Sequence, residues 1–421
     1  MTKTTSIHLP LFQRFDCHSC GYCCRNLVVN VTDTERETIL KAGWQSRIPD
    51  RPLFKRYRFK GRDLYRLAKY PDDRCIFLSD DGLCRLHAET GIKTKPLACR
   101  LYPFVPTPGT DTVHIDLRVD CPSVAANKGR NLTVHSQEID GLVRETGTRA
   151  MTEPPMWQGT RQLSMEEFQA VVAAFEGLLR KGSLPIRTRL LAGCYLLDLL
   201  YTIRVQKVRD DRLVELIELL SEAAIEEAQQ QNNSVNQLSK RPAKLFRQWL
   251  FLHTITDNPD DLDAGFLKKI TRSWSRYRQA RRFITYRGPV PPVMPGWSTA
   301  DFEDIARIKT GPDDTLEPLC RSLRVKLDAH AFAGPGYYKY DLIPGLTALW
   351  LSSAVVGWLA RLTAITKQRD TLTLDDILTG LRQAHHTYGV SPVFARFSER
   401  WRLRGLANVG TPAALLREYG P

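Results

Sequence analysis

The sequence predicts a small cysteine-rich α+β module followed by a larger all-α domain, so that the chain is mostly α overall. Eight of the ten cysteines lie between Cys17 and Cys121 in a chain of 421 residues. Short β-branched segments and turns share that stretch, and capped helical periodicity follows it. We therefore expect a cysteine-cluster metal-binding module over residues 1–125 and a helical body over residues 126–421, with a flexible linker near 229–236.

The module begins with four thiols within eight residues, spaced C-x2-C-x2-C-C. The β-branched segment Asn26–Val31 then predicts a strand. Thr32 and Glu35 match a capping box, which predicts a helix to about residue 42.

The other four thiols of the module stand alone in the sequence. Cys75 and Cys84 flank a turn and predict a small hairpin with one cysteine on each arm. Prolines on both sides of Cys99 place it at the end of a short helix or in a tight turn. The alternating segment Val113–Val119 predicts a strand that leads to Cys121.

Beyond the module, apolar periodicity and caps predict helices over about 164–181, 186–207, 210–230, 241–255, 261–285, 313–330, 341–366 and 373–388, and one that begins at 298. The longest apolar run, Leu346–Ala360, is shorter than the roughly 20 residues of a membrane span. It therefore predicts a buried core helix and no membrane span.

No apolar run follows a basic start in Met1–Phe15, so we expect no export signal and a cytoplasmic protein. Stable disulfides are disfavoured in a reducing compartment, and metal ligation becomes the leading explanation of the thiols. Cys194 and Cys320 have apolar helical surroundings and are expected to be buried free thiols. The predicted metal ligands are Cys17, Cys20, Cys23, Cys24, Cys75, Cys84, Cys99 and Cys121.

Thiolates are ligands of zinc and of iron–sulfur clusters, and eight of them can form one site with four to spare, or two sites. Cys23 and Cys24 would point to opposite sides of an extended segment, which favours a multi-metal cluster or two sites over one zinc ion. His18 and His87 are further candidate ligands. His385 and His386 end a predicted helix, where cations are favourable.

The net charge of +14 is concentrated in two stretches, Arg47–Arg74 with a net of +6 and Lys268–Arg287 with a net of +8. Such charge suits a polyanion, an acidic protein or an anionic cofactor group. In the second stretch, apolar residues at helical spacing predict a core stripe with arginines on the exposed side: Leu267, Ile270, Trp274, Tyr277 and Ile284. A helix of this kind could follow a phosphate backbone, so nucleic acid stays open as a partner, although no nucleic-acid-binding motif accompanies it.

No G-x-x-x-x-G-K-S/T sequence occurs, and no G-x-G-x-x-G follows a strand. The sequence therefore predicts neither a P-loop nor a Rossmann site for a dinucleotide or a methyl donor. It assigns no catalytic residue.

A combination of segments carries a resemblance to a known family: Cys17-x2-Cys20-Gly-x-Cys23-Cys24, Cys75-x-Phe-Leu, Gly82-x-Cys84-x-Leu-His87 and Lys95-Pro-x-x-Cys99-Arg-x-Tyr-Pro-Phe104. Over about residues 1–125 the chain resembles the YkgJ-type family of zinc- or iron-chelating cysteine-cluster proteins. The longer layout, with Cys121-Pro and a helical remainder, resembles the flagellin lysine N-methylases of the FliB type.

The second resemblance implies an iron–sulfur cluster of the 4Fe–4S kind and methyl transfer from S-adenosylmethionine to lysines of a flagellin-like protein substrate. The alternative is a non-enzymatic protein that binds metal, zinc included, and offers a basic surface to nucleic acid or to an acidic partner. Both remain open at the level of the sequence.

Overall fold

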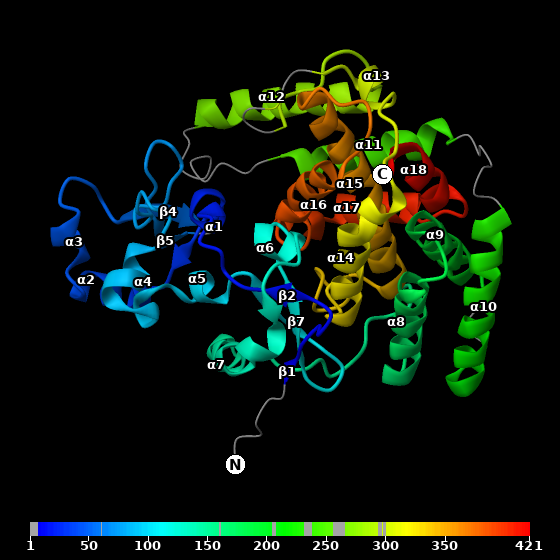
Figure 1. The fold of residues 1–421 in the computed structure, drawn as a ribbon, viewed down its shortest axis with the longest axis horizontal. Coiled ribbons are helices and arrows are strands. Elements are labelled where there is room, and N and C mark those ends of the chain that lie inside the picture. The colour runs from blue at the N-terminus through cyan, green and yellow to red at the C-terminus, as the bar shows by residue number, and fades with distance from the viewer. Residues whose placement is uncertain are drawn as a thin grey trace.

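The computed structural model describes the chain except residues 1–6, 60, 160, 204–207, 231–237, 256–265, 294–296 and 298–299. A small α+β region at the N-terminus lies beside a larger helical region (Figure 1), which confirms the predicted fold class. Most of the expected linker, and Ser298 at the start of one predicted helix, lie outside the described residues.

The cysteine-rich part comprises α1 (Tyr22–Asn26), β3 (Asn30–Val31), α2 (Asp33–Lys41), α3 (Trp44–Arg47), β4 (Phe54–Phe59), β5 (Arg62–Leu67), α4 (Arg85–Thr90), the 3-10 turn Ile92–Thr94 and α5 (Leu97–Leu101). The strands form an antiparallel sheet in the order β3-β5-β4. A core of its own, separate from that of the body, includes Ile39, Trp44 and Phe77. The side chain of Thr32 accepts a hydrogen bond from the Glu35 backbone at 3.2 Å, which confirms the predicted capping box.

Two predictions in this part were wrong in detail. The segment expected as a strand from Asn26 is helical until that residue, and within it only Asn30–Val31 forms a strand. Gly21, with φ of 67°, turns the chain into this helix, a conformation that glycine adopts at no steric cost. The expected hairpin is reduced to one bridge, between Leu78 and Cys84, because the second arm winds into α4.

The segment between the two regions holds β1 (Ile7–His8), β2 (Arg14–Phe15), β6 (Phe104–Pro108), β7 (Val113–Leu117), α6 (Pro122–Ala125), β8 (Arg130–Asn131), the 3-10 turn Leu132–His135 and α7 (Ser136–Thr146). One sheet has the order β1-β7-β6, with β1 parallel to β7, and β2 pairs with β8. The prediction of a strand at Val113 is confirmed. Its side chains pack in the same core as the helical body.

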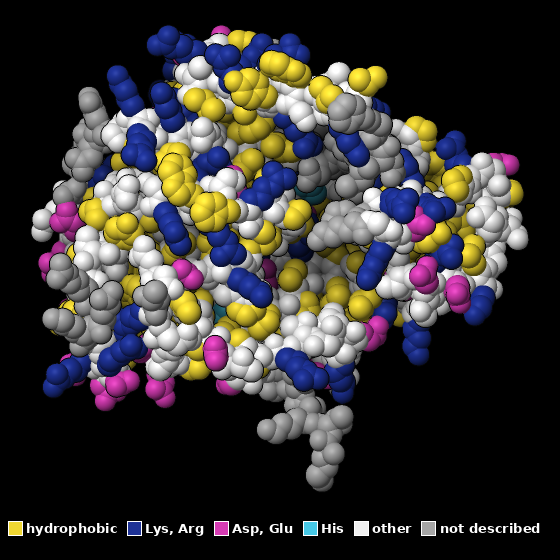
Figure 2. All heavy atoms as spheres, turned by 180° about the vertical axis from the view of Figure 1, so that it is seen from behind, with side chains coloured by type: hydrophobic (Ala, Val, Ile, Leu, Met, Phe, Trp, Pro, Cys, Tyr) yellow, Lys and Arg dark blue, Asp and Glu magenta, His cyan; other side chains and the backbone are white. Residues whose placement is uncertain are grey.

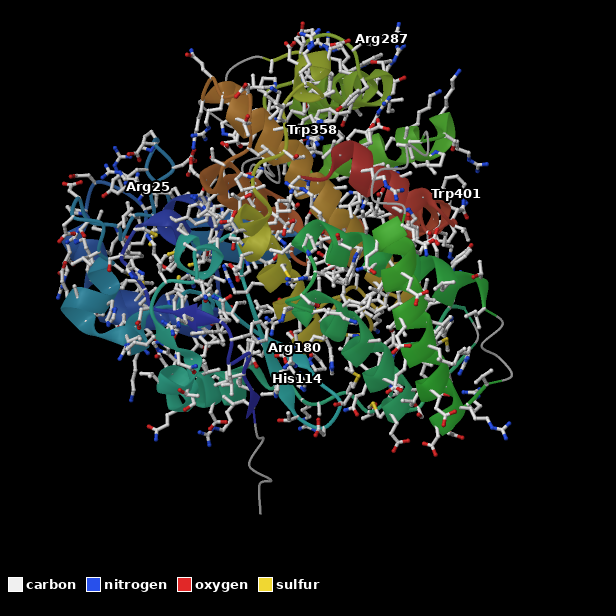
Figure 3. All side chains as sticks on the ribbon, turned by 45° about the vertical axis from the view of Figure 1, so that its right-hand side comes forward. Arg25, His114, Arg180, Arg287, Trp358 and Trp401 are labelled. Atoms are coloured by element: carbon white, nitrogen blue, oxygen red, sulfur yellow. The ribbon has the colours of Figure 1, made fainter. Side chains whose placement is uncertain are left out.

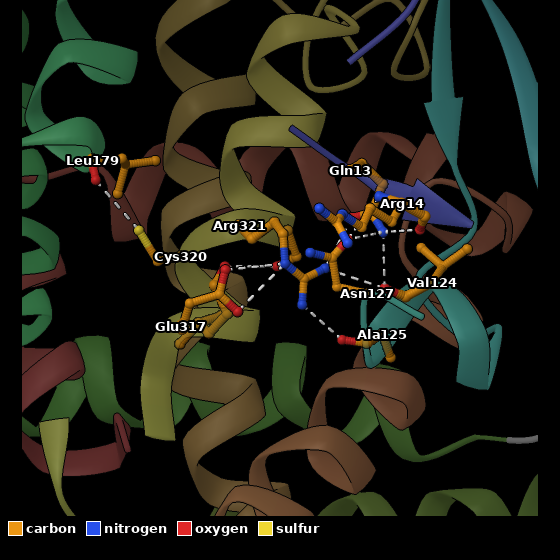
Figure 4. A network of polar contacts seen from close by, with 11 residues as sticks. Gln13, Arg14, Val124, Ala125, Asn127, Leu179, Glu317, Cys320 and Arg321 are labelled. Carbon is orange, nitrogen blue, oxygen red and sulfur yellow. Dashed lines mark hydrogen bonds and ion pairs between the residues drawn. The ribbon is translucent and has the colours of Figure 1, made fainter. Parts of the chain in front are cut away.

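One buried arginine of the body clamps the segment that follows Cys121 (Figure 4). Arg321 donates hydrogen bonds to the carbonyls of Val124 and Ala125, at 3.1 and 2.9 Å, and to the side chain of Gln13 at 2.9 Å. Its only carboxylate contact shown is with Glu317 on the same helix. The end of the module is thus held against the helical body by backbone carbonyls.

The body consists of α8 (Met165–Arg180), α9 (Ile186–Thr202), α10 (Asp210–Gln230), α11 (Lys240–Thr254), α12 (Phe266–Thr285), α13 (Phe302–Ile305), α14 (Glu317–Asp328), α15 (Leu342–Thr366), α16 (Leu374–Thr387), α17 (Phe397–Leu406) and α18 (Thr411–Tyr419). The sequence predicts the helices up to α16 with small shifts of their ends, but not α17 or α18. Among the described residues, α15 is long and apolar enough to cross a membrane, and its apolar stretch is buried throughout. This confirms the predicted core helix.

The orientation of α12 contradicts the prediction of a core stripe. Leu267 and Trp274 are 78% and 59% exposed, and Ile270 and Tyr277 are exposed as well. Phe283, which the prediction leaves out of the stripe, is fully buried. Periodicity identifies the apolar face of a helix, but tertiary packing decides which face meets the core.

Candidate metal centre

Five of the eight thiols of the module line one small cavity of about 50 Å³: Cys23, Cys24, Cys75, Cys84 and Cys99. They come from α1, from the two ends of the turn before α4, and from α5. The remaining wall is mainly apolar and includes Leu27, Phe77 and Tyr102. Segments more than 70 residues apart in sequence therefore present soft sulfur ligands to one space.

The two adjacent thiols are close together rather than opposed. Cys23 and Cys24 lie in a helical turn, and their sulfur atoms are 3.9 Å apart. Sulfur atoms bound at about 2.3 Å to one tetrahedral metal ion are separated by about 3.8 Å. The expectation that the pair points to opposite sides was wrong because it assumed an extended chain, and the observed spacing suits two ligands of one metal.

Two lysines add positive charge to this cavity. Lys69 and Lys95 both line it, and the Nζ atom of Lys69 donates to the Arg25 carbonyl at 2.6 Å. The positive charge of Lys69 acts to lower the pKa of Cys75, and that of Lys95 acts to lower the pKa values of Cys23 and Cys99. A dication with four thiolates carries a net charge of −2, which two ammonium groups can balance.

Burial raises the pKa of the Cys75 thiol to about 11 and raises that of Cys99 further, whereas the contact with Cys24 lowers the pKa of Cys23. Within the described part of the chain, no group of three or more His, Cys, Asp or Glu side chains is arranged closely enough to hold a metal ion. A bound metal would therefore displace protons and draw the thiols together by rotation of their side chains.

The other three thiols of the module do not line this cavity. Cys17 and Cys20 are exposed, and Cys121 is buried at the start of α6. Burial raises the pKa of Cys121 to about 11, and a charge on Cys20 acts in the same direction. The Nδ1 atom of His18 lies 2.8 Å from the hydroxyl of Ser123, so the first cysteine loop docks onto α6.

The remaining candidate residues lie apart from the thiol cavity. His87 is exposed on α4 and is not among the residues that line it. Cys194 and Cys320 are buried free thiols in the helical body, as predicted. The thiol of Cys320 donates to the Leu179 carbonyl at 3.5 Å.

A buried carboxylate joins the module to the body, and the sequence analysis missed it. Asp120 accepts two hydrogen bonds from Arg118, at 3.0 and 2.5 Å, and one from the phenol of Tyr102 at 3.3 Å. The Nδ1 atom of His386, from α16, lies 3.4 Å from it. Burial opposes ionisation, but the hydrogen bonds of His386 and Arg118 outweigh it and hold the pKa of Asp120 below its ordinary value.

The pair of histidines that ends α16 is divided between two environments. His386 faces Asp120, whereas His385 is 2% exposed and burial holds its pKa well below the ordinary value. The prediction of two cations at the helix end was therefore wrong for His385. Neither ring nitrogen of His385 has a hydrogen-bond partner among the described residues.

Comparison with known proteins is consistent with the chemistry of the thiols. Residues 16–123 match the CxxCxxCC family, described as "Putative zinc- or iron-chelating domain". Over 97 residues the chain is 31% identical to an uncharacterized protein of Methanocaldococcus jannaschii, a match that covers 21% of this chain and 29% of that protein. No solved structure matches the chain. Over residues 16–123 the chain thus resembles a zinc- or iron-chelating domain of the CxxCxxCC type.

Proposed function

We propose that the protein binds its metal through the five-thiol cavity, with four of these thiolates as ligands. The observation that carries this proposal is that Cys23, Cys24, Cys75, Cys84 and Cys99 line one space beside two lysines. Since buried thiols with raised pKa values gain nothing from being ionised alone, a metal ion is the partner that makes their deprotonation favourable. The metal also ties α1, the turn before α4 and α5 to one another.

For the metal, we propose a 4Fe–4S cluster, with a single zinc ion as the alternative. Four cysteine thiolates are the usual ligands of such a cluster and of structural zinc. The resemblance to the flagellin lysine N-methylases supports the cluster, and the 3.9 Å sulfur separation of Cys23 and Cys24 also suits zinc. Iron, zinc and acid-labile sulfide, measured on protein purified without oxygen, decide between the two.

Two variants test the ligand set on the full chain. Cys99→Ser removes one thiol of the cavity, and we expect loss of most of the bound metal and a lower melting temperature. Cys320→Ala is the matched control, a buried thiol of the helical body, and should retain the metal. Full metal content in Cys99→Ser would contradict the assignment of this cavity. A separate variant, Cys20→Ser, tests whether the thiols outside the cavity bind a metal of their own.

A second candidate function, methylation of protein lysines, is favoured by one observation. Tyr102 borders the thiol cavity and also contacts Asp120, so the proposed metal site and the buried carboxylate meet at one side chain. In this reaction the lysine nitrogen bonds to the methyl carbon of a sulfonium donor as the carbon–sulfur bond breaks. S-adenosylmethionine would supply the methyl group.

Asp120 carries a charge that suits this role. An ionised carboxylate attracts a lysine ammonium group, and an apolar channel lowers the pKa of the amine so that it loses its proton before it attacks. The aromatic ring of Tyr22, which Arg382 covers at 4.6 Å, belongs to the same junction. We therefore place the proposed lysine site between α1, Tyr102 and the end of α16.

The assay incubates the metal-loaded full-length protein with S-adenosylmethionine and flagellin and measures methyl-lysine by mass. Asp120→Asn should lose activity at unchanged metal content, whereas Asp50→Asn, at an exposed position, should not. Failure of the metal-loaded protein to bind S-adenosylmethionine rejects lysine methylation and leaves the metal proposal intact.

A further inference from the structure

Helix α12 presents an apolar stripe to solvent. Leu267, Ile270, Trp274 and Tyr277 are 78%, 42%, 59% and 55% exposed. Their spacing of three and four residues puts them on one face of the helix, over a length of about 15 Å. Large apolar side chains exposed singly need no explanation, but four in a row on one helix face mark an interaction site.

The opposite face of α12 holds the helix on the body. Phe283 is fully buried, with its ring 5.3 Å from Phe251, 5.2 Å from Phe302 and 5.4 Å from Trp358. Trp358 lies within the helical body in Figure 3, whereas Arg287, just beyond α12, lies at its outer edge. At 100° per residue, Phe283 lies roughly opposite Trp274 on the helix. The helix is therefore anchored through one aromatic residue, and its apolar stripe faces away from the core.

The charge around the stripe has a single sign. From Lys268 to Arg287 the chain carries eight Lys and Arg and no acidic residue. Arg278, Arg281 and Arg282 are exposed and continue the outward face beyond Tyr277. Figure 2 shows hydrophobic side chains interspersed with Lys and Arg along the upper edge of the molecule, where Figure 1 places α12. The partner of this face has to be anionic and has to accept aliphatic and aromatic side chains.

Several possible partners can be compared with these observations. Single-stranded nucleic acid would stack on Trp274 and Tyr277, but it has no use for Leu267 and Ile270. A second copy of the chain would bring two stretches of net charge +8 together, which like-charge repulsion opposes. A helix that presents its apolar side chains on one exposed face suits a planar partner.

We propose that α12 docks in the plane of an anionic lipid membrane. Leu267, Ile270 and Trp274 enter the boundary between headgroups and acyl chains, Tyr277 lies at the headgroup level, and the arginines bind lipid phosphates. This is the arrangement of interfacial amphipathic helices, whose affinity combines apolar burial with attraction to anionic lipid. The proposal is independent of the metal site, because α12 contributes no residue to the thiol cavity.

The test is co-sedimentation of the full-length protein with vesicles of equal parts phosphatidylglycerol and phosphatidylcholine, compared with phosphatidylcholine alone. We expect binding to the anionic vesicles only, with a decrease as salt increases. The double variant Ile270→Ser/Trp274→Ser should bind at least about tenfold more weakly, because it removes much of the apolar contact. Arg278→Gln/Arg281→Gln should lose about fivefold for each arginine.

The control is Leu219→Ser, since Leu219 is 64% exposed on α10, away from α12. It should bind like the unchanged protein, and all variants should melt at the same temperature because the altered side chains are exposed. Equal vesicle binding by the Ile270→Ser/Trp274→Ser variant overturns the proposal. So does absence of vesicle binding, or tighter binding of a single-stranded oligonucleotide that the same variant abolishes.

Discussion

The phenol of Tyr102 donates a hydrogen bond to the buried carboxylate of Asp120 at 3.3 Å. Tyr102 also borders the five-thiol cavity, and Asp120 contacts His386 of the helical body. The cysteine-rich part and the body are therefore joined through a charged group that is fully excluded from solvent.

Asp120→Asn should lower the free energy of unfolding by about 3 kcal/mol, because it leaves the guanidinium of Arg118 in the junction without its carboxylate. Arg118 is largely buried beside it. Urea unfolding measures the change. Asp50→Asn, at an exposed site, should stay within about 0.5 kcal/mol of the unchanged protein, and a similarly small effect of Asp120→Asn would show that this carboxylate is not needed for stability.

The pair of Lys326 and Asp116 ties α14 to β7. The Nζ atom of Lys326 lies 2.6 Å from the carboxylate of Asp116, and both side chains are 6% exposed. Lys326→Met should cost about 3–5 kcal/mol, since it leaves a buried carboxylate unpaired. In the double variant Lys326→Met/Asp116→Leu most of this loss should disappear. If the loss in the double variant equals the sum of the losses in Lys326→Met and Asp116→Leu, the two side chains do not interact as the distance indicates.

Gly193 marks the close approach of α9 and α15. A methyl group at this position would lie 2.2 to 2.3 Å from atoms of the Trp350 ring, whose Nε1 donates to the Leu190 carbonyl at 3.0 Å. Gly193→Ala should therefore destabilise the protein by about 1–3 kcal/mol through overpacking. Gly177→Ala, on α8 with no atom near the added methyl, should instead stabilise by about 0.5–1 kcal/mol. A melting temperature that rises in both variants would contradict the close approach.

Asp198 makes stability depend on pH. Burial raises the pKa of this carboxyl to about 7, although the Gly410 backbone N–H opposes the shift with a hydrogen bond of 2.9 Å. The native state then holds a proton that the unfolded chain releases near its ordinary pKa of about 3.9. The stability that this group contributes is complete below about pH 4 and falls as the pH rises towards 7. Above pH 7 it is constant, after a total loss on the order of 4 kcal/mol.

Asp198→Asn should remove this dependence. The amide oxygen can still accept the Gly410 hydrogen bond, so the variant should match the unchanged protein near pH 4 and exceed it above pH 7. Unfolding curves at pH 4, 5.5, 7 and 8 measure the difference between the two proteins. A constant difference across this range would show that the carboxyl does not titrate there.

The sequence alone determined the features that depend on neighbouring residues. The capping boxes at Thr32, Ser164 and Thr373 begin α2, α8 and α16 as predicted, because each is satisfied within four residues of chain. The burial of α15 follows from an apolar surface on all sides. The crowding of cysteines identified the metal-binding part, and the fold class followed from the change of periodicity after it. The division of the chain at residue 125 stays a prediction.

Only the tertiary structure decided which residues meet. It brought Cys75 and Cys99 to the same cavity as Cys23 but left Cys121 outside, and it placed His385 in the core beside the junction. It also turned the apolar stripe of α12 towards solvent, with Phe283 as the anchor. These outcomes depend on contacts between segments that are far apart in the chain. The free energy of such contacts exceeds the local conformational preferences of each segment, and no short stretch of sequence contains them.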